Sequence, residues 1–265
     1  MAQTAPALPA APGQPAAPLG VIDALGMGWR LTMSDFWNLW LAAFVLTLVM
    51  MAASNFGLVA AVLLQPPLMA GLYWLVSRKI DGAPVKMGDV FEGFQKRFGQ
   101  SVLAMLPVTL AGMVFGMAIA AVVLVIMFGG AGIGAAIAEE SHSDEAAVAV
   151  VVIGIVLGGG LVLVLSLALI IFCMFFNFVF PAVWDHPESG WEAVRVSARL
   201  VRSRFWSVLG LTILVLLIAA AANLVGMLAC CIGVLFTAPV AMVWQAATVT
   251  YLYRSWTGRP LIQGA

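Results

Sequence analysis

Four long stretches of the chain contain no charged residue and consist mostly of apolar side chains. They are residues 36–77, 98–138, 146–184 and 205–253. A helix needs about 20 residues to cross the roughly 30 Å of hydrocarbon in a bilayer, so the first and last stretches are each long enough for two helices. Turn-forming residues interrupt both of them, at Ser54–Gly57 and Gly226–Gly233. The middle stretches predict one helix each, at about residues 101–128 and 147–176, which gives six spans.

The composition excludes a water-soluble fold. Hydrophobic residues make up 63% of the chain and charged residues only 9%, against about 25% in a typical soluble domain. So few charges cannot cover a soluble globule, and the predicted fold is an all-α, polytopic membrane helix bundle. Cys173, Cys230 and Cys231 lie in apolar stretches without a neighbouring histidine or carboxylate, so we interpret them as packing residues and expect no metal or other cofactor.

The basic residues indicate the orientation of the chain. All twelve lie before the first predicted span, between the second and third, between the fourth and fifth, or after the sixth. The loop between the third and fourth spans has none and carries Glu139, Glu140, Asp144 and Glu145 instead. Since cytoplasmic loops are enriched in lysine and arginine, we expect both termini in the cytoplasm. The net charge of zero gives no indication of a nucleic-acid partner.

The two ends of the chain are predicted to lie outside the membrane domain. Prolines at positions 6, 9, 12, 15 and 18 repeat every three residues among alanines, which matches the period of a polyproline II helix. We expect a disordered cytoplasmic tail over residues 1–20, a six-span membrane domain over residues 21–255 and a short cytoplasmic tail over residues 256–265.

One sequence pattern occurs twice, and a weaker version occurs a third time. Residues 30–37 match residues 199–206 at five of eight positions, with an offset of 169. Residues 97–103 resemble the second copy. An amphipathic stretch precedes each copy and apolar helices follow it. The pattern predicts three parallel internal repeats, each made of an interfacial amphipathic helix and a hairpin.

The third interfacial helix is the best candidate for a lipid-binding surface. Its apolar stripe is formed by Trp191, Val194, Ala198, Val201 and Phe205. Arg195, Arg199 and Arg202 form a basic stripe beside it, as expected for a helix on an anionic leaflet. These arginines are candidates for binding lipid headgroups. The alternative is that they only anchor the topology of the neighbouring spans. A similar apolar face in the second repeat predicts a helix lying flat in the headgroup layer: Met87, Val90, Phe91, Phe94 and Phe98.

A short polar cluster is the strongest catalytic candidate in the chain. Asp185, His186 and Glu188 offer three ligand or acid–base groups within four residues. The competing interpretation is a helix cap, in which Asp185 caps the third interfacial helix and Glu188 completes a capping box. We favour the cap and predict no catalytic residue and no metal site. His142 in the acidic loop either holds a divalent cation or is simply solvated.

The predicted spans contain no charged residue, which argues against an ion-coupled pump. Neutral polar residues are present in them, including Gln65, Asn177, Asn223, Thr237 and Gln245. Asn177 and Asn223 either line a polar pocket or form hydrogen bonds between helices. Glycines spaced four apart predict that the third and fourth spans pack closely, with contacts between copies of the chain as an alternative: Gly112, Gly116, Gly154 and Gly158.

Five further segments carry a recognisable pattern: residues 66–73, 88–94, 180–183, 191–197 and 231–239. On these segments the chain resembles a group of uncharacterised bacterial six-span inner-membrane proteins related to the membrane domain of glycerophosphodiester phosphodiesterases. The resemblance covers most of residues 20–255 and implies six spans in a bacterial plasma membrane. It implies no established activity, and the phosphodiesterase domain itself is absent from the sequence.

We therefore expect a non-enzymatic protein with a membrane-organising, partner-binding or envelope-maintenance role. Its expected partners are membrane lipids, including anionic ones, and a membrane protein or a second copy of the chain. An alternative is a facilitator of lipid or small-amphiphile movement. A lipid-modifying enzyme is a more distant alternative.

Overall fold

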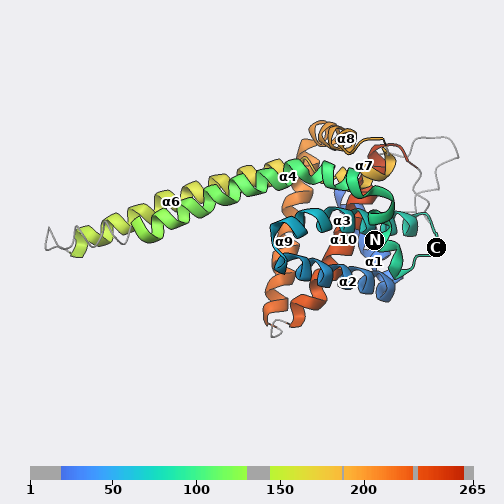
Figure 1. The fold of residues 1–265 in the computed structure, drawn as a ribbon, viewed down its shortest axis with the longest axis horizontal. Helices are drawn as coiled ribbons and strands as arrows, with labels where there is room; N and C mark the ends of the chain where they lie inside the picture. The colour runs from blue at the N-terminus through green and yellow to red at the C-terminus, as the bar shows by residue number, and fades with distance from the viewer. Residues whose placement is uncertain (1–18, 130–143, 187, 229–231, 260–265) are drawn as a thin grey trace, which may run out of the picture.

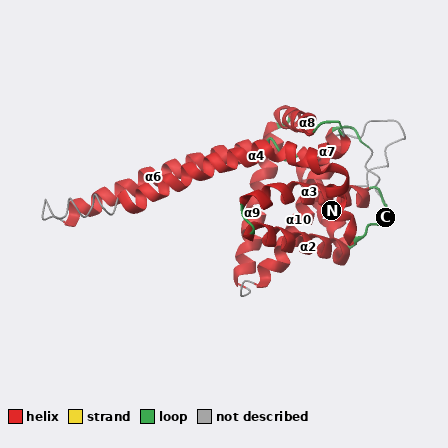
Figure 2. Ribbon diagram, viewed as in Figure 1, coloured by secondary structure: helices red, strands yellow, loops and turns green. Residues whose placement is uncertain are grey.

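The computed structural model describes residues 19–129, 144–186, 188–228 and 232–259, and all regular structure in these ranges is helical (Figures 1 and 2). The elements are α1 (Val21–Ser34), α2 (Phe36–Asn55), α3 (Leu58–Ile80), η1 (Met87–Phe91), α4 (Glu92–Leu124), η2 (Val125–Gly129), α6 (Asp144–Met174), α7 (Val179–Asp185), α8 (Gly190–Ser203), α9 (Phe205–Leu228) and α10 (Ile232–Trp256). The proline-rich tail, the loop segment with His142, and the cysteine pair 230–231 lie outside the described residues.

Five helical segments within the described residues are long and apolar enough to cross a membrane. They are Phe36–Asn55, Met87–Phe128, Val152–Asp185, Phe205–Leu224 and Leu235–Trp256. The chain is therefore an all-helical protein with several helices suited to a membrane. The turn predicted near Ser54–Gly57 is confirmed, because α2 ends at Asn55 and α3 begins at Leu58. Gly57 has a φ of 90°, a backbone conformation that favours glycine.

The α4–α6 hairpin extends away from the rest of the molecule, whereas α9 and α10 form a second hairpin that points in another direction (Figure 1). With 33 and 31 residues, α4 and α6 are each on the order of 50 Å long. Helices α4 and α6 pack against each other as predicted, but not through Gly112, Gly116 or Gly154. A Cβ atom added at any of these three would meet nothing within 4 Å, and only Gly158 faces a neighbour, Ile126.

Three helix junctions share the same backbone break. The residues at the breaks are Asp35 (φ −143°, ψ 51°), Arg97 (φ −136°, ψ 21°) and Arg204 (φ −132°, ψ 39°). A phenylalanine follows each break, at position 36, 98 or 205. The amphipathic helices α1 and α8, which precede two of these breaks, are both 14 residues long.

The second interfacial helix differs from its prediction. Residues 87–91 form a 3-10 turn, and the α-helix that starts at Glu92 breaks again at Arg97. Val90 is fully buried, while Met87 and Phe98 are exposed. The backbone of this segment lies in direct contact with the backbone of α3. A Cβ on Gly71 would lie 1.6 Å from the carbonyl oxygen of Val90, and a Cβ on Gly93 would lie 2.0 Å from that of Pro67.

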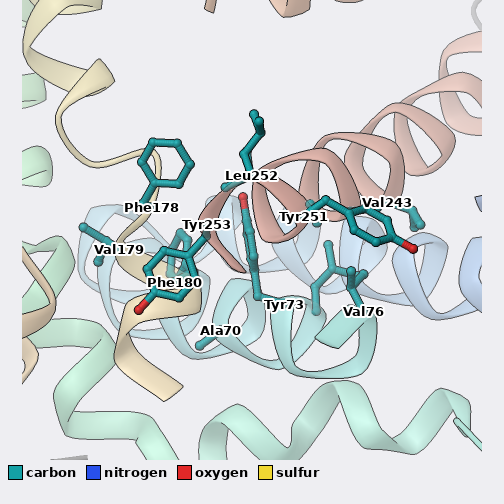
Figure 3. Close-up of a cluster of buried hydrophobic side chains, with 14 of the residues drawn as sticks. Ala70, Tyr73, Val76, Phe178, Val179, Phe180, Val243, Tyr251, Leu252 and Tyr253 are labelled. Atoms are coloured by element: carbon teal, nitrogen blue, oxygen red, sulfur yellow. The ribbon is translucent and has the colours of Figure 1, made fainter. Parts of the chain in front are cut away.

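The core lies where α3, α7 and α10 meet (Figure 3). The rings of Tyr73 and Phe180 stack with their centroids 5.3 Å apart, and Phe178 packs against Tyr253 at 6.5 Å. Helix α1 packs along α10, and the indole of Trp244 donates a hydrogen bond to the carbonyl of Leu25 at 3.1 Å. Beside the end of α10, the amide of Leu19 donates to Ser255 at 2.7 Å. The first and last described segments of the chain are therefore neighbours.

Candidate functional site

Helix α8 is fixed to the body by one face. Its buried residues include Gly190, Val194, Ser197 and Val201. A Cβ on Gly190 would lie 2.2 Å from the carbonyl oxygen of Gln100, so α8 touches the backbone of α4. The hydroxyl of Ser197 donates to the carbonyl of Phe175 at 2.7 Å and accepts from the amide of Phe178 at 3.2 Å. These two bonds hold α8 against the link between α6 and α7.

The opposite face of α8 carries the three arginines predicted as headgroup ligands. Arg195, Arg199 and Arg202 are all exposed. The guanidinium of Arg195 lies 3.7 Å from Glu192, whereas Arg199 and Arg202 have no ion pair within the part of the chain that the structure describes. Trp191 (47% exposed) and Trp206 (80% exposed) lie near the two ends of α8. Exposed tryptophans beside arginines are typical of a membrane–water interface.

The polar cluster Asp185, His186 and Glu188 does not form one site. Asp185 ends α7, and its carboxylate, only 11% exposed, forms an ion pair with Arg259 and also interacts with Tyr253. Glu188 is exposed and His186 is half-buried. Within the described ranges, no three of the chain's His, Cys, Asp and Glu side chains are placed to hold a metal ion.

The predicted cap at Asp185 is wrong. The N-cap of α8 is Ser189, whose side chain accepts a hydrogen bond from the amide of Trp191 at 3.2 Å. Helix α8 begins at Gly190, too far along the chain for Asp185 to reach its first turn. Asp185 instead joins α7 to the segment after α10.

A second ion pair, which the sequence did not indicate, joins α3 to α10. The guanidinium of Arg254 binds both carboxylate oxygens of Asp81, with the Nη2 to Oδ2 distance at 2.9 Å. It also donates to the hydroxyl and the carbonyl of Ser77. Residues 81 and 254 are 173 positions apart, so no local pattern links them.

Aromatic rings and cations lie near the ion pairs of Arg254 and Arg259. Trp74 and Trp184 stack at 4.4 Å, and the indole of Trp184 donates to the carbonyl of Ala70 at 2.8 Å. The cation of Lys96 lies 5.7 Å from the Trp74 ring, and that of Arg97 lies 5.6 Å from the Trp184 ring. Such cation–π contacts fix the basic residues in place. We call the region formed by these rings and the Arg254 and Arg259 ion pairs the basic end.

Neutral polar residues of the apolar helices line two cavities. A cavity of about 320 Å³ between α6, α9 and α10 contains Asn177, Thr212 and Gln245. A cavity of about 300 Å³ between α2, α3, α9 and α10 contains Gln65, Asn223 and again Gln245. Asn177 satisfies both predicted roles, since it lines the first cavity and donates to Thr212 at 3.2 Å.

A third cavity, of about 640 Å³, lies between α1, α9 and α10 and is almost entirely apolar. Its walls include Trp29, Phe236 and Trp244. This cavity offers shape and hydrophobic contact but no chemistry that selects one ligand.

The described residues form an all-helical protein with several helices suited to a membrane, an amphipathic helix α8 with an exposed basic face, and cavities between helices that are lined in part by neutral polar residues. The profile of a domain of unknown function, DUF7847, matches residues 38–253, and the chain belongs to that family. No curated protein and no solved structure matches the chain.

Proposed function

We propose that the protein is a non-enzymatic, membrane-organising component of a bacterial inner membrane, and that α8 is its surface for anionic lipid headgroups. The observation that carries this proposal is that the guanidinium groups of Arg199 and Arg202 are exposed and form no ion pair with any described residue. Arginine donates two parallel hydrogen bonds to a phosphate, and the neighbouring tryptophans hold the helix at the depth where phosphates lie.

The proposed topology has six spans, with both termini in the cytoplasm. Helix α3 supplies the sixth span, since its 23 residues follow α2 after a two-residue turn. The positive-inside rule places the twelve basic residues in the cytoplasm. The contact of Leu19 with Ser255 supports placing both described ends of the chain on one side. The shared breaks at Asp35, Arg97 and Arg204 support three parallel repeats.

The test removes the positive charges of Arg199 and Arg202. Arg199→Gln/Arg202→Gln is compared with Arg30→Gln/Lys86→Gln, a double variant that removes two exposed positive charges elsewhere. Native mass spectrometry of the purified full chain measures the retained phosphatidylglycerol. Each contact with the leaflet contributes on the order of 1 kcal/mol, so we expect at least about a tenfold loss of retention in the α8 variant only. Equal retention in both variants would reduce the α8 arginines to topology anchors.

The two polar cavities favour a second candidate function, the movement of lipids or small amphiphiles across the membrane. They lie between different pairs of hairpins and both reach Gln245. Scrambling of a fluorescent lipid by the purified protein in liposomes distinguishes this candidate from a static organising role.

A further inference from the structure

The two polar cavities lie one after the other along the α9–α10 hairpin, and we call the two together the groove. On α9 the lining residues Thr212, Val215, Ala219 and Asn223 follow one another at spacings of three or four, and so form a single face. On α10 the lining residues Ala238, Met242, Gln245 and Val249 do the same. Gln245 lines both cavities. The groove runs from Thr212 to Asn223, about 16 Å along α9.

The opposite wall changes along this groove, and each part supplies a carboxamide. Near Thr212 the wall is the end of α6 and its following turn, with Asn177. Near Asn223 the wall is α2 and α3, with Gln65. Apolar side chains form most of the remaining lining, among them Ile170, Leu216 and Met242. No charged residue is among the described residues that line either cavity.

Three of these amides lack a partner in the part of the chain that the structure describes. Gln65, Asn223 and Gln245 are exposed, and none of them donates or accepts a hydrogen bond there. Both α9 and α10 are among the helices apolar enough to cross a membrane. An amide in hydrocarbon is strongly unfavourable unless its donors and acceptor are paired. No described residue satisfies these amides, so a ligand bound in the groove has three amides available for hydrogen bonds.

We propose that the groove binds an uncharged amphiphile whose headgroup carries hydroxyl or amide groups. A carboxamide offers two donors and one acceptor with no net charge, which suits alcohols and amides. A phosphate or an ammonium group would enter the groove without a counter-charge and would be excluded. The apolar walls take up the hydrocarbon chain. This site is separate from the α8 surface, because it recognises neutral headgroups and does not depend on the arginines.

The first measurement is retention of 1-oleoylglycerol by the purified full chain in native mass spectrometry, with ionised oleate as the chain-matched charged competitor. We compare the wild type with Gln245→Leu, and with Gln95→Leu as the control, since Gln95 is exposed at the start of α4 outside the groove. The wild type and the control should prefer 1-oleoylglycerol, and Gln245→Leu should bind it about tenfold more weakly. Asn223→Leu removes an amide from the other helix and should act in the same way.

The melting temperature separates a binding site from a structural bond between helices. If Gln245 is a ligand-binding residue, Gln245→Leu removes an amide that has no partner in the absence of ligand. The ligand-free variant should then melt at the same temperature as the wild type or at a higher one. If Gln245 holds α10 to its neighbours, leucine lowers the melting temperature and leaves retention unchanged, which overturns the proposal. Equal retention of 1-oleoylglycerol and oleate by the wild type also overturns it. None of these outcomes depends on the α8 variants.

A second readout uses Cys173, which lines the same groove as Asn177. In a Cys230→Ala/Cys231→Ala background it is the only thiol of the chain. Bound 1-oleoylglycerol should slow its labelling by N-ethylmaleimide, and Gln245→Leu should abolish that protection. An unchanged labelling rate in the wild type would count against occupation of the groove.

Discussion

The two partners of the Asp81–Arg254 ion pair differ in burial, and the effect of that difference on stability can be tested. The side chain of Arg254 is 10% exposed, whereas that of Asp81 is 46% exposed. Asp81→Asn leaves a nearly buried guanidinium without its counter-charge, while Arg254→Met leaves a carboxylate that water already reaches. The aspartate substitution should therefore destabilise the protein more than the arginine substitution does.

The magnitudes follow from the contacts. Breaking a buried pair by removing one partner costs about 3–5 kcal/mol. In Asp81→Asn the guanidinium keeps its bonds to the hydroxyl and carbonyl of Ser77, so we expect a loss nearer to about 2–3 kcal/mol. In Arg254→Met the apolar stem is replaced by a side chain of similar shape, and the exposed carboxylate is solvated. We expect a loss of about 1 kcal/mol there.

Equilibrium unfolding of the purified chain in detergent, followed by tryptophan fluorescence, measures both values. Asp23→Asn and Lys86→Met serve as controls because both residues are exposed and neither forms an ion pair in the described part of the chain. The double variant should cost less than Asp81→Asn alone and about as much as Arg254→Met, since it leaves no guanidinium without a counter-charge. Equal losses, or a larger loss for Arg254→Met, would refute the reasoning.

The remaining predictions concern packing and topology. Gly71→Ala places a Cβ 1.6 Å from the Val90 carbonyl oxygen and should cost several kcal/mol of stability or prevent folding. Gly112→Ala places its Cβ in open space and should stabilise α4 by about 0.5–1 kcal/mol. Thermal melting of the two variants measures both effects, and equal melting temperatures would contradict this prediction. A cysteine at position 88 should react with an impermeant thiol reagent only from the cytoplasmic side and one at position 142 only from the outside, and reversed labelling of cells and inverted vesicles would overturn the topology.

Those parts of the fold that depend on neighbouring residues were predictable from the sequence. The α2–α3 turn follows from two apolar lengths and a glycine between them, and the boundary between α8 and α9 falls within the matched residues 199–206. Contacts between distant residues were not predictable. The sequence relates Arg254 only to the orientation of the spans, because its partner Asp81 lies 173 residues away. The spacing of Asp185 to Glu188 fits a capping box, but Ser189 is the N-cap of α8 in the structure.

The candidate sites divide in the same way. The exposure of Arg195, Arg199 and Arg202 follows from the amphipathic period of α8 alone, and the structure has them exposed. The groove, in contrast, could not be predicted from the sequence, because it exists only where the α9–α10 hairpin packs against other helices. Asn177, Asn223 and Gln245 come from three different elements, and only their arrangement brings them to the same two cavities.

Polar groups differ along α10: a charged pair ties its C-terminal end to α3, and a neutral amide in its middle faces the groove. Near its C-terminal end, Arg254 meets Asp81, and this charged pair ties α10 to α3. Nine residues earlier, at Gln245, the chain carries a neutral amide that faces a cavity. A charge at that depth would need a counter-charge, and none of the described residues lining the groove provides one. A carboxamide needs only a hydrogen-bonding partner, which a neutral headgroup or water supplies. The ion pairs of the basic end thus hold the hairpins together. The groove between the hairpins is not needed for that contact, so it stays open for a ligand while the fold is kept.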